Sequence, residues 1–193
     1  MQAQKGRGRA NALKGELAVR LEETSRAPAE AVYDLLADVR SHLEWGGRMQ
    51  PKRNFRLVSV EAPTGPASVG TEFASTGIDP MGTFADSSVI TEASRPKLLE
   101  FVTEARLSTK KGKVVEWTNV HRYEIEPQDD GCKITYTLRT VRISELPGAL
   151  RLFKVPGLRW IGLKLSGSAM RRGFKNLVTL ADGGSRAGRR DRS

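Results

Sequence analysis

The sequence VVEWTNVHRYEIE, residues 114–126, alternates between two kinds of side chain along its length. A period of two is typical of a β-strand that buries one face. The face that must point inward is largely apolar, yet it carries Asn119 and His121 at its middle. The next alternating segment, residues 132–143, follows after a short turn and places Tyr136 in a similar inward row. These two segments are therefore predicted to be neighbouring strands of one antiparallel sheet.

Further strand-like segments precede this pair, with no helical pattern between them. They are expected at about residues 55–62, 71–78, 83–92 and 98–107. The breaks between them are short and rich in proline, glycine, aspartate and lysine, and the first three of these residue types favour turns. Short connections join antiparallel neighbours, whereas parallel strands need a longer crossover. The segments therefore predict an antiparallel meander.

Helical patterns flank the meander on both sides. Residues 16–26 alternate as a first strand, and Pro28 then precedes apolar residues at helical spacing as far as Val39. A second short helix is expected at about residues 40–45, ended by the glycine pair at 46–47. Near the C-terminus a stripe at helical spacing consists of Trp160, Leu163, Gly167, Met170, Phe174, Leu177 and Ala181. This order predicts an α+β protein in which a long amphipathic helix lies across a curved sheet.

Positive charge is concentrated at the two ends of the chain. The formal net charge is +10, and more than half of it comes from residues 1–15 and 186–193. We therefore expect a basic disordered arm over residues 1–15, one folded domain over 16–182 and a basic disordered tail over 183–193. Aromatic residues make up only 6% of the chain and are not interleaved with the basic runs, so nucleic acid is not an expected partner.

Several classes of protein are excluded by composition. The single cysteine, Cys132, allows neither an internal disulfide nor a cysteine-based zinc site. The two histidines lie far apart with no patterned partners, so no metal site is expected. No glycine-rich nucleotide loop occurs, and no cofactor is expected. Apolar runs are far shorter than the roughly 20 residues that span a bilayer, and no secretory signal is expected. The expected location is the cytoplasm.

Several stretches of the chain resemble the START-like, or SRPBCC, superfamily, and most closely its polyketide cyclase/dehydrase group. They are TSRAPAEAVYDLLAD at 24–38 with Trp45 after it, VGTEF at 69–73, YEIEP at 123–127 with Gly131, and FKNL at 174–177. The resemblance covers about residues 16–182. It implies a START-like helix-grip fold: a curved seven-stranded antiparallel sheet around a long C-terminal helix, with two short helices after the first strand. It also implies a hydrophobic cavity between the sheet and that helix.

The implied cavity leads to two functional hypotheses. The first is a carrier or sensor that binds a hydrophobic small molecule, which is lipid-, sterol- or polyketide-like. The second is an enzyme of the polyketide cyclase or dehydratase type, in which His121 is the candidate catalytic residue because histidine can exchange a proton near neutral pH. The alternatives for His121 are a histidine hydrogen-bonded in the core and a histidine near an open sheet edge. The candidate ligand-binding residues are Phe73, Phe84, Trp117, Asn119, His121, Tyr123, Tyr136, Met170 and Phe174.

Three further features have more than one interpretation. His42 is expected at the surface, although cavity mouths often lie near this position in the resembling fold. Asp86 shares a strand face with Phe84 and is expected to face solvent; on a cavity wall it would be a buried acid with a raised pKa. Residues 144–175 interleave cations with apolar side chains, which indicates either peripheral contact with an anionic membrane or an ordinary amphipathic helix after a packed loop. A third hypothesis for function is that the basic arms bind nucleic acid or such a membrane.

Overall fold

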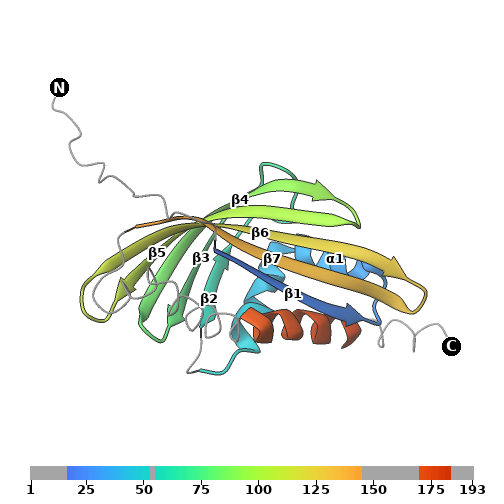
Figure 1. The fold of residues 1–193 in the computed structure, drawn as a ribbon, viewed down its shortest axis with the longest axis horizontal. Coiled ribbons are helices and arrows are strands. Elements are labelled where there is room, and N and C mark those ends of the chain that lie inside the picture. The colour runs from blue at the N-terminus through green and yellow to red at the C-terminus, as the bar shows by residue number, and fades with distance from the viewer. Residues whose placement is uncertain (1–16, 53–54, 145–169, 184–193) are drawn as a thin grey trace.

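A seven-stranded antiparallel sheet forms the body of the protein in the computed structural model, which describes residues 17–52, 55–144 and 170–183 (Figure 1). The strands are β1 (Leu17–Ser25), β2 (Arg56–Glu61), β3 (Glu72–Asp79), β4 (Gly82–Ser94), β5 (Leu98–Thr109), β6 (Val114–Gln128) and β7 (Gly131–Ile143). Their order in the sheet is β1-β7-β6-β5-β4-β3-β2. The predicted meander is confirmed, and the predicted strands coincide with the observed ones except at their ends.

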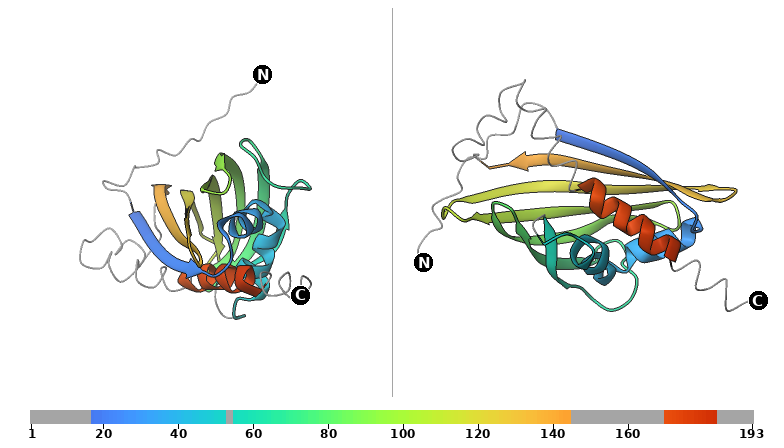
Figure 2. Two further views of the ribbon diagram at one scale, coloured as in Figure 1. Left: turned by 90° about the vertical axis from the view of Figure 1, so that its right-hand side faces the viewer. Right: turned by 90° about the horizontal axis from the view of Figure 1, so that it is seen from below.

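Helices lie against the concave face of the sheet. The helix α1 (Ala29–Ala37) and the short helices η1 (Val39–Ser41) and η2 (Glu44–Arg48) follow β1. The C-terminal helix, residues 170–183, ends the described part of the chain. Figure 2 shows the sheet curling around these helices, which confirms the predicted helix-grip architecture. Of the predicted apolar stripe, Trp160, Leu163 and Gly167 lie outside the described residues.

The first helix begins where the sequence indicates. Pro28 is extended, and its carbonyl oxygen accepts hydrogen bonds from the backbone N–H groups of Ala31 at 3.0 Å and Val32 at 3.3 Å. Glu30 lies in the first turn, where a negative charge is favourable near the positive end of the helix dipole. The apolar face of α1 then buries Val32 and Leu36 completely. The local sequence and the packing therefore favour the same helix.

The glycine pair at 46–47 has a different role from the predicted one. It does not end a helix at residue 45, because both glycines lie inside η2, a turn of π-helix. A Cβ atom on Gly47 would lie 2.7 Å from the carbonyl oxygen of Leu57, and one on Gly46 would lie 3.0 Å from the Cδ1 atom of the same leucine. The glycines therefore allow η2 and β2 to approach closely.

β-Bulges give the long strands their curvature. The pairing register shifts between Leu57 and Ser59 on β2, between Ile90 and Glu92 on β4, and between Thr118 and Asn119 on β6. A bulge bends its strand and increases the local twist. The extra residues are Thr91 on β4 and Val141 on β7, so these two long strands can wrap around the helices instead of forming a flat sheet.

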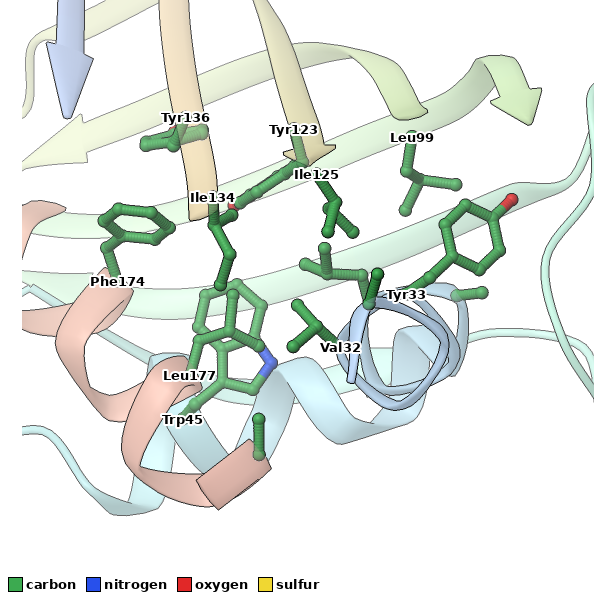
Figure 3. Packing of buried hydrophobic residues seen from close by; sticks show 14 of the residues in the cluster. Val32, Tyr33, Trp45, Leu99, Tyr123, Ile125, Ile134, Tyr136, Phe174 and Leu177 are labelled. Atoms are coloured by element: carbon green, nitrogen blue, oxygen red, sulfur yellow. The ribbon is translucent and has the colours of Figure 1, made fainter. Parts of the chain in front are cut away.

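The main apolar core joins α1, the C-terminal helix and one end of the concave face (Figure 3). Leu177 of the C-terminal helix is fully buried beside Ile134 and Val32. Polar contacts also hold this helix in place: the Nδ2 atom of Asn176 donates to the carbonyl oxygen of Trp45 at 3.1 Å, and Asp182 accepts a hydrogen bond from the Ser25 hydroxyl. The core therefore fixes the position of the helix relative to the sheet.

Candidate functional site

The concave face of the sheet presents side chains in rows that run across the strands. In the main core, one row contains Leu99, Tyr123, Tyr136 and Leu21. The second row contains Ile90, Phe101, His121 and Leu138. Two largely polar rows follow: Phe73, Ser88, Thr103, Asn119 and Thr140, and then Ser75, Asp86, Ala105 and Trp117. The last row is apolar and contains Phe84, Leu107 and Val115. The face is therefore apolar at both ends and polar in between.

His121 lies in an aromatic stack. Its ring is parallel to that of Phe101, with a centroid distance of 4.6 Å and an interplanar angle of 10°. Its Nδ1 atom lies 2.9 Å from the hydroxyl oxygen of Tyr136, which is itself stacked on Tyr123 at 4.6 Å. Tyr136 accepts a hydrogen bond from Tyr123, so its own proton is free to be donated to Nδ1. We therefore assign the ring proton of His121 to Nε2.

His42 lies on the other side of Phe101, and the expectation that it is a surface residue is wrong. It is only 5% exposed and packs against Trp45, Phe73 and Phe101 at centroid distances of 4.8, 6.1 and 6.0 Å. Its Nε2 atom donates to the carbonyl oxygen of Leu36 at 2.9 Å. The position follows from the fold of η1 and η2 beneath the concave face, which the local sequence does not reveal.

Both histidines are neutral at neutral pH. Burial lowers the pKa of His42 to about 4. Burial and repulsion by His42 lower the pKa of His121 to about 3. General acid–base catalysis is most effective when the pKa lies near the working pH. At neutral pH, His121 is therefore suited to hydrogen bonding and poorly suited to proton transfer.

A band of polar side chains crosses the middle of the concave face. We call it the polar belt, and it consists of Ser75, Asp86, Ser88, Thr103, Asn119 and Thr140. The hydroxyls of Ser88 and Thr103 lie 2.8 Å apart, and both residues are buried. The Thr140 hydroxyl donates to the Oδ1 atom of Asn119 at 2.8 Å. Four of the six side chains thus form hydrogen-bonded pairs between neighbouring strands.

Asp86 is the charged member of the polar belt, and the expectation that it faces solvent is wrong. It lies on the concave face between Ser75 of β3 and Ala105 of β5. Burial raises the pKa of Asp86 to about 7, although a hydrogen bond from Ser75 opposes this shift. Its Oδ1 atom is buried and has no hydrogen-bond partner. Sequence alternation could not identify the buried face of β4, because Ala85 and Val89 on the other face are also apolar.

The predicted ligand-binding residues fall into separate parts of the structure. Phe73, Tyr123, Tyr136 and Phe174 belong to the main core, where Tyr136 and Phe174 approach each other across the space between sheet and helix (Figure 3). Phe84 and Trp117 belong to a second apolar cluster at the other end of the sheet. Asn119 belongs to the polar belt, and Met170 is partly buried at the start of the described C-terminal helix. The prediction missed Phe101 and Thr103. The alternation along residues 98–107 could have placed both on the concave face with the other candidate residues.

Other candidate chemistry is limited in the part of the chain that the structure describes. Cys132 is fully buried, and burial raises the pKa of its thiol to about 11, so the thiol stays protonated. Within residues 17–52, 55–144 and 170–183, no three histidine, cysteine, aspartate or glutamate side chains gather closely enough to hold a metal ion. A hollow of about 260 Å³ lies between η2 and β2 and is lined in part by Leu43, Gln50 and Arg56.

Most of the segment predicted to contact a membrane, residues 145–169, lies outside the described residues, as do both basic arms. Among the residues that are described, no helix is both long enough and apolar enough to cross a membrane.

Comparison with known proteins identifies the fold. No protein-family model matches the chain, and no curated protein matches its sequence. Solved structures do match. An uncharacterised protein from Rhizobium leguminosarum aligns with a TM-score of 0.61 at 13% identity, over 87% of this chain and 95% of that one. A protein of unknown function from Staphylococcus aureus aligns with a TM-score of 0.56 at 12% identity, over 90% of this chain and 97% of that one.

One similar structure has an assigned superfamily. Ara h 8.0201 aligns with a TM-score of 0.54 at 17% identity, over 86% of this chain and 98% of that one. It is a Bet v 1-like protein of the SRPBCC superfamily. Identities this low show a shared fold and no more. The resemblance to the SRPBCC superfamily is thus supported at the level of the fold, and the polyketide cyclase/dehydrase group stays a prediction.

Proposed function

We propose that the concave face binds a hydrophobic small molecule and that the protein is its carrier or sensor. One observation carries the proposal: the inward face of β6 is buried at both ends and only partly buried in the middle. Val115 and Tyr123 are 2% and 4% exposed, whereas Trp117, Asn119 and His121 between them are partly exposed. A sheet face that served only as core would be covered throughout.

The neighbouring strand shows the same pattern. On β7, Tyr136 is buried, but Leu138 and Thr140 are only partly buried, and Leu138 lies directly opposite His121. The incompletely covered area therefore spans two strands and combines an apolar side, at Leu138, with a hydrogen-bonding side, at Asn119. Ligand sites of small molecules have this composition. Hydrophobic ligand binding is also what the Bet v 1-like fold suggests at the level of the superfamily.

The properties of His121 favour a carrier or sensor over the cyclase or dehydratase alternative. A neutral histidine stacked on Phe101 can hold a ligand group by a hydrogen bond, but its low pKa makes it a weak proton acceptor. The proposed ligand is lipid-, sterol- or polyketide-like, because rings and chains of this kind match the stacked aromatic surface.

Diphenylhexatriene, a hydrocarbon probe that fluoresces in apolar surroundings, tests the proposal on the full chain. We expect saturable binding of the probe and a lipid-like molecule in solvent extracts of the purified protein. Leu138→Trp places a large ring over the partly covered area and should weaken probe binding about tenfold or more. Val141→Trp is the matched control, because Val141 lies on the same strand but is exposed, and it should bind as the natural chain does. Absence of probe binding, or equal weakening by both variants, would contradict the proposal.

A further inference from the structure

We propose that the polar belt makes the site selective for amphipathic molecules that carry a hydrogen-bond donor, a hydroxyl or an amine, and that the carboxylate of Asp86 accepts this bond. The inference rests on the proposed function and specifies the class of ligand. The apolar part of such a molecule would lie against Phe101, His121 and Leu138, and its donor group would reach Asp86.

The first argument is the unpaired acceptor. The Oδ1 atom of Asp86 is buried and has no hydrogen-bond partner, whereas Ser75 supplies one hydrogen bond to the carboxyl group. A buried acceptor without a partner costs free energy that a structural core has no reason to spend. A donor on a bound molecule would remove this cost, and the gain would be larger for a charged acceptor than for a neutral one.

The second argument is that the other polar side chains around Asp86 already have hydrogen-bond partners. Ser88 and Thr103 bond to each other, and Thr140 bonds to Asn119, so these hydroxyls already have partners. Across the strands, Asp86 is flanked by Ser75 and by the methyl group of Ala105. None of these side chains carries a positive charge that could pair with the carboxylate. Asp86 is therefore the open hydrogen-bonding position of the polar belt.

The third argument is the order of the rows. The rows on one side of the polar belt contain Phe101 with His121 and then Tyr123 with Tyr136, and the row on the other side contains Phe84 with Leu107. A wholly apolar ligand would have to cover paired hydroxyls and a carboxyl group, which is unfavourable. A fatty acid would bring its own carboxylate towards that of Asp86, and like charges repel. The arrangement thus favours a donor over an acceptor on the ligand.

Competition against diphenylhexatriene measures the selectivity. Decylamine, 1-decanol and decanoate have the same alkyl chain and differ in the head group. At pH 8.5, above the pKa of about 7 that burial gives Asp86, we expect decylamine and 1-decanol to displace the probe from the full chain at concentrations about tenfold lower than decanoate. In Asp86→Asn, which keeps the size of the side chain and removes its charge, this preference should fall to less than about threefold.

Two further variants serve as controls. Glu104→Gln removes an exposed carboxylate from the opposite face of β5 and should keep the preference of the natural chain. Ser87→Ala removes an exposed hydroxyl next to Asp86 in the sequence but on the opposite face of β4, so it should also keep the preference. The two controls therefore show whether a loss of selectivity requires a change on the concave face.

The outcomes separate the inference from the proposed function. Equal displacement by the three alkyl compounds, tighter binding of decanoate, or a preference that persists in Asp86→Asn overturns the inference while binding of the probe stands. A failure of diphenylhexatriene to bind at all overturns the proposed function, and the inference with it.

Discussion

Asp182, near the end of the C-terminal helix, accepts a hydrogen bond from the hydroxyl of Ser25, at the end of β1, across 2.6 Å. The same carboxylate accepts a second bond from the backbone N–H group of Arg26 at 2.9 Å. The contact joins the two ends of the described chain at the point where β1 leads into α1. Although burial opposes it, hydrogen bonding by Ser25 and Arg26 holds the pKa of Asp182 below its ordinary value.

Asp182→Ala should lower the free energy of unfolding by about 1–3 kcal/mol, because Ser25 and the Arg26 N–H group lose their acceptor. Urea denaturation measures the change. Arg26→Ala is the control, since the Arg26 side chain is 67% exposed and its ion pair with Asp182 should contribute little. Equal losses in the two variants would show that the ion pair, and not the hydrogen bonds, holds the helix.

Tyr136→Phe should shift the tautomer equilibrium of His121. Without the Tyr136 hydroxyl, Nδ1 loses the donor that places the ring proton on Nε2. Nitrogen-15 NMR of the imidazole should show the Nε2–H form in the natural chain and a mixture of tautomers in the variant. Urea denaturation should show a loss of about 1–2 kcal/mol. An Nδ1–H form in the natural chain would contradict the assignment.

Acid should destabilise the protein through its buried histidine, His42. The pKa of His42 is about 4 in the folded chain, whereas its ordinary value is 6.5. The contribution of His42 to the free energy of unfolding is therefore complete above pH 6.5 and is lost as the pH falls towards 4. Since His42→Gln keeps a side-chain donor for the Leu36 carbonyl but does not titrate, its unfolding free energy should fall less than that of the natural chain between pH 7 and 4. The difference should reach at most about 3 kcal/mol. Parallel curves for the two proteins would exclude this source of acid sensitivity.

Asp86 should make the protein less stable as the pH rises, which is the opposite of the effect of His42. Its folded pKa of about 7 lies above the ordinary 3.8, so the stability that it contributes is complete below pH 4 and is lost as the pH rises towards 7. Asp86→Asn should therefore match the natural chain near pH 4 and exceed its unfolding free energy at pH 8, by at most about 4 kcal/mol. Urea denaturation at the two pH values tests this. A variant that is less stable than the natural chain at pH 8 would show that the carboxylate is not destabilising.

Alanine at the two glycines of η2 should have unequal effects. Gly47→Ala would place its methyl group against the backbone carbonyl of Leu57, which cannot move without β2, whereas Gly46→Ala would meet only the end of the Leu57 side chain. Thermal unfolding should therefore show the larger loss for Gly47→Ala, about 1–3 kcal/mol. The reverse order would mean that β2 gives way more easily than the leucine side chain.

The fold could be predicted from the sequence because its patterns are local. The alternation in β6, the turn residues and the helical spacing after Pro28 each specify one element, and short connections specify antiparallel neighbours. The role of the glycine pair at 46–47 could not be predicted in this way, because it depends on contact with Leu57, which is close in space but belongs to another element.

The candidate site was less accessible to prediction for the same reason. The inward placement of His121, Asn119 and Tyr136 could be predicted because β6 and β7 alternate clearly, whereas their role in ligand binding stays a prediction. His42 and Asp86 were assigned to the surface, since a histidine in a short helix and an aspartate on a mixed strand have no local pattern that indicates burial. Their burial results from packing between distant parts of the chain, where His42, at the end of η1, meets Phe101 and where β4 lies between β3 and β5.

The bulge on β7, opposite Thr118 and Asn119 of β6, changes which side chains of β7 point to the interior. Before it, even-numbered residues such as Tyr136 and Thr140 point to the interior; after it, Ile143 lies opposite Trp117 and joins the second apolar cluster. One additional residue, Val141, thereby allows a single strand to supply both apolar ends of the molecule without a loop. Without the additional residue, Ile143 would point to the opposite face of the sheet, because a shift of one residue moves every later side chain of a strand to the other side. The second apolar cluster would then lose its contribution from β7.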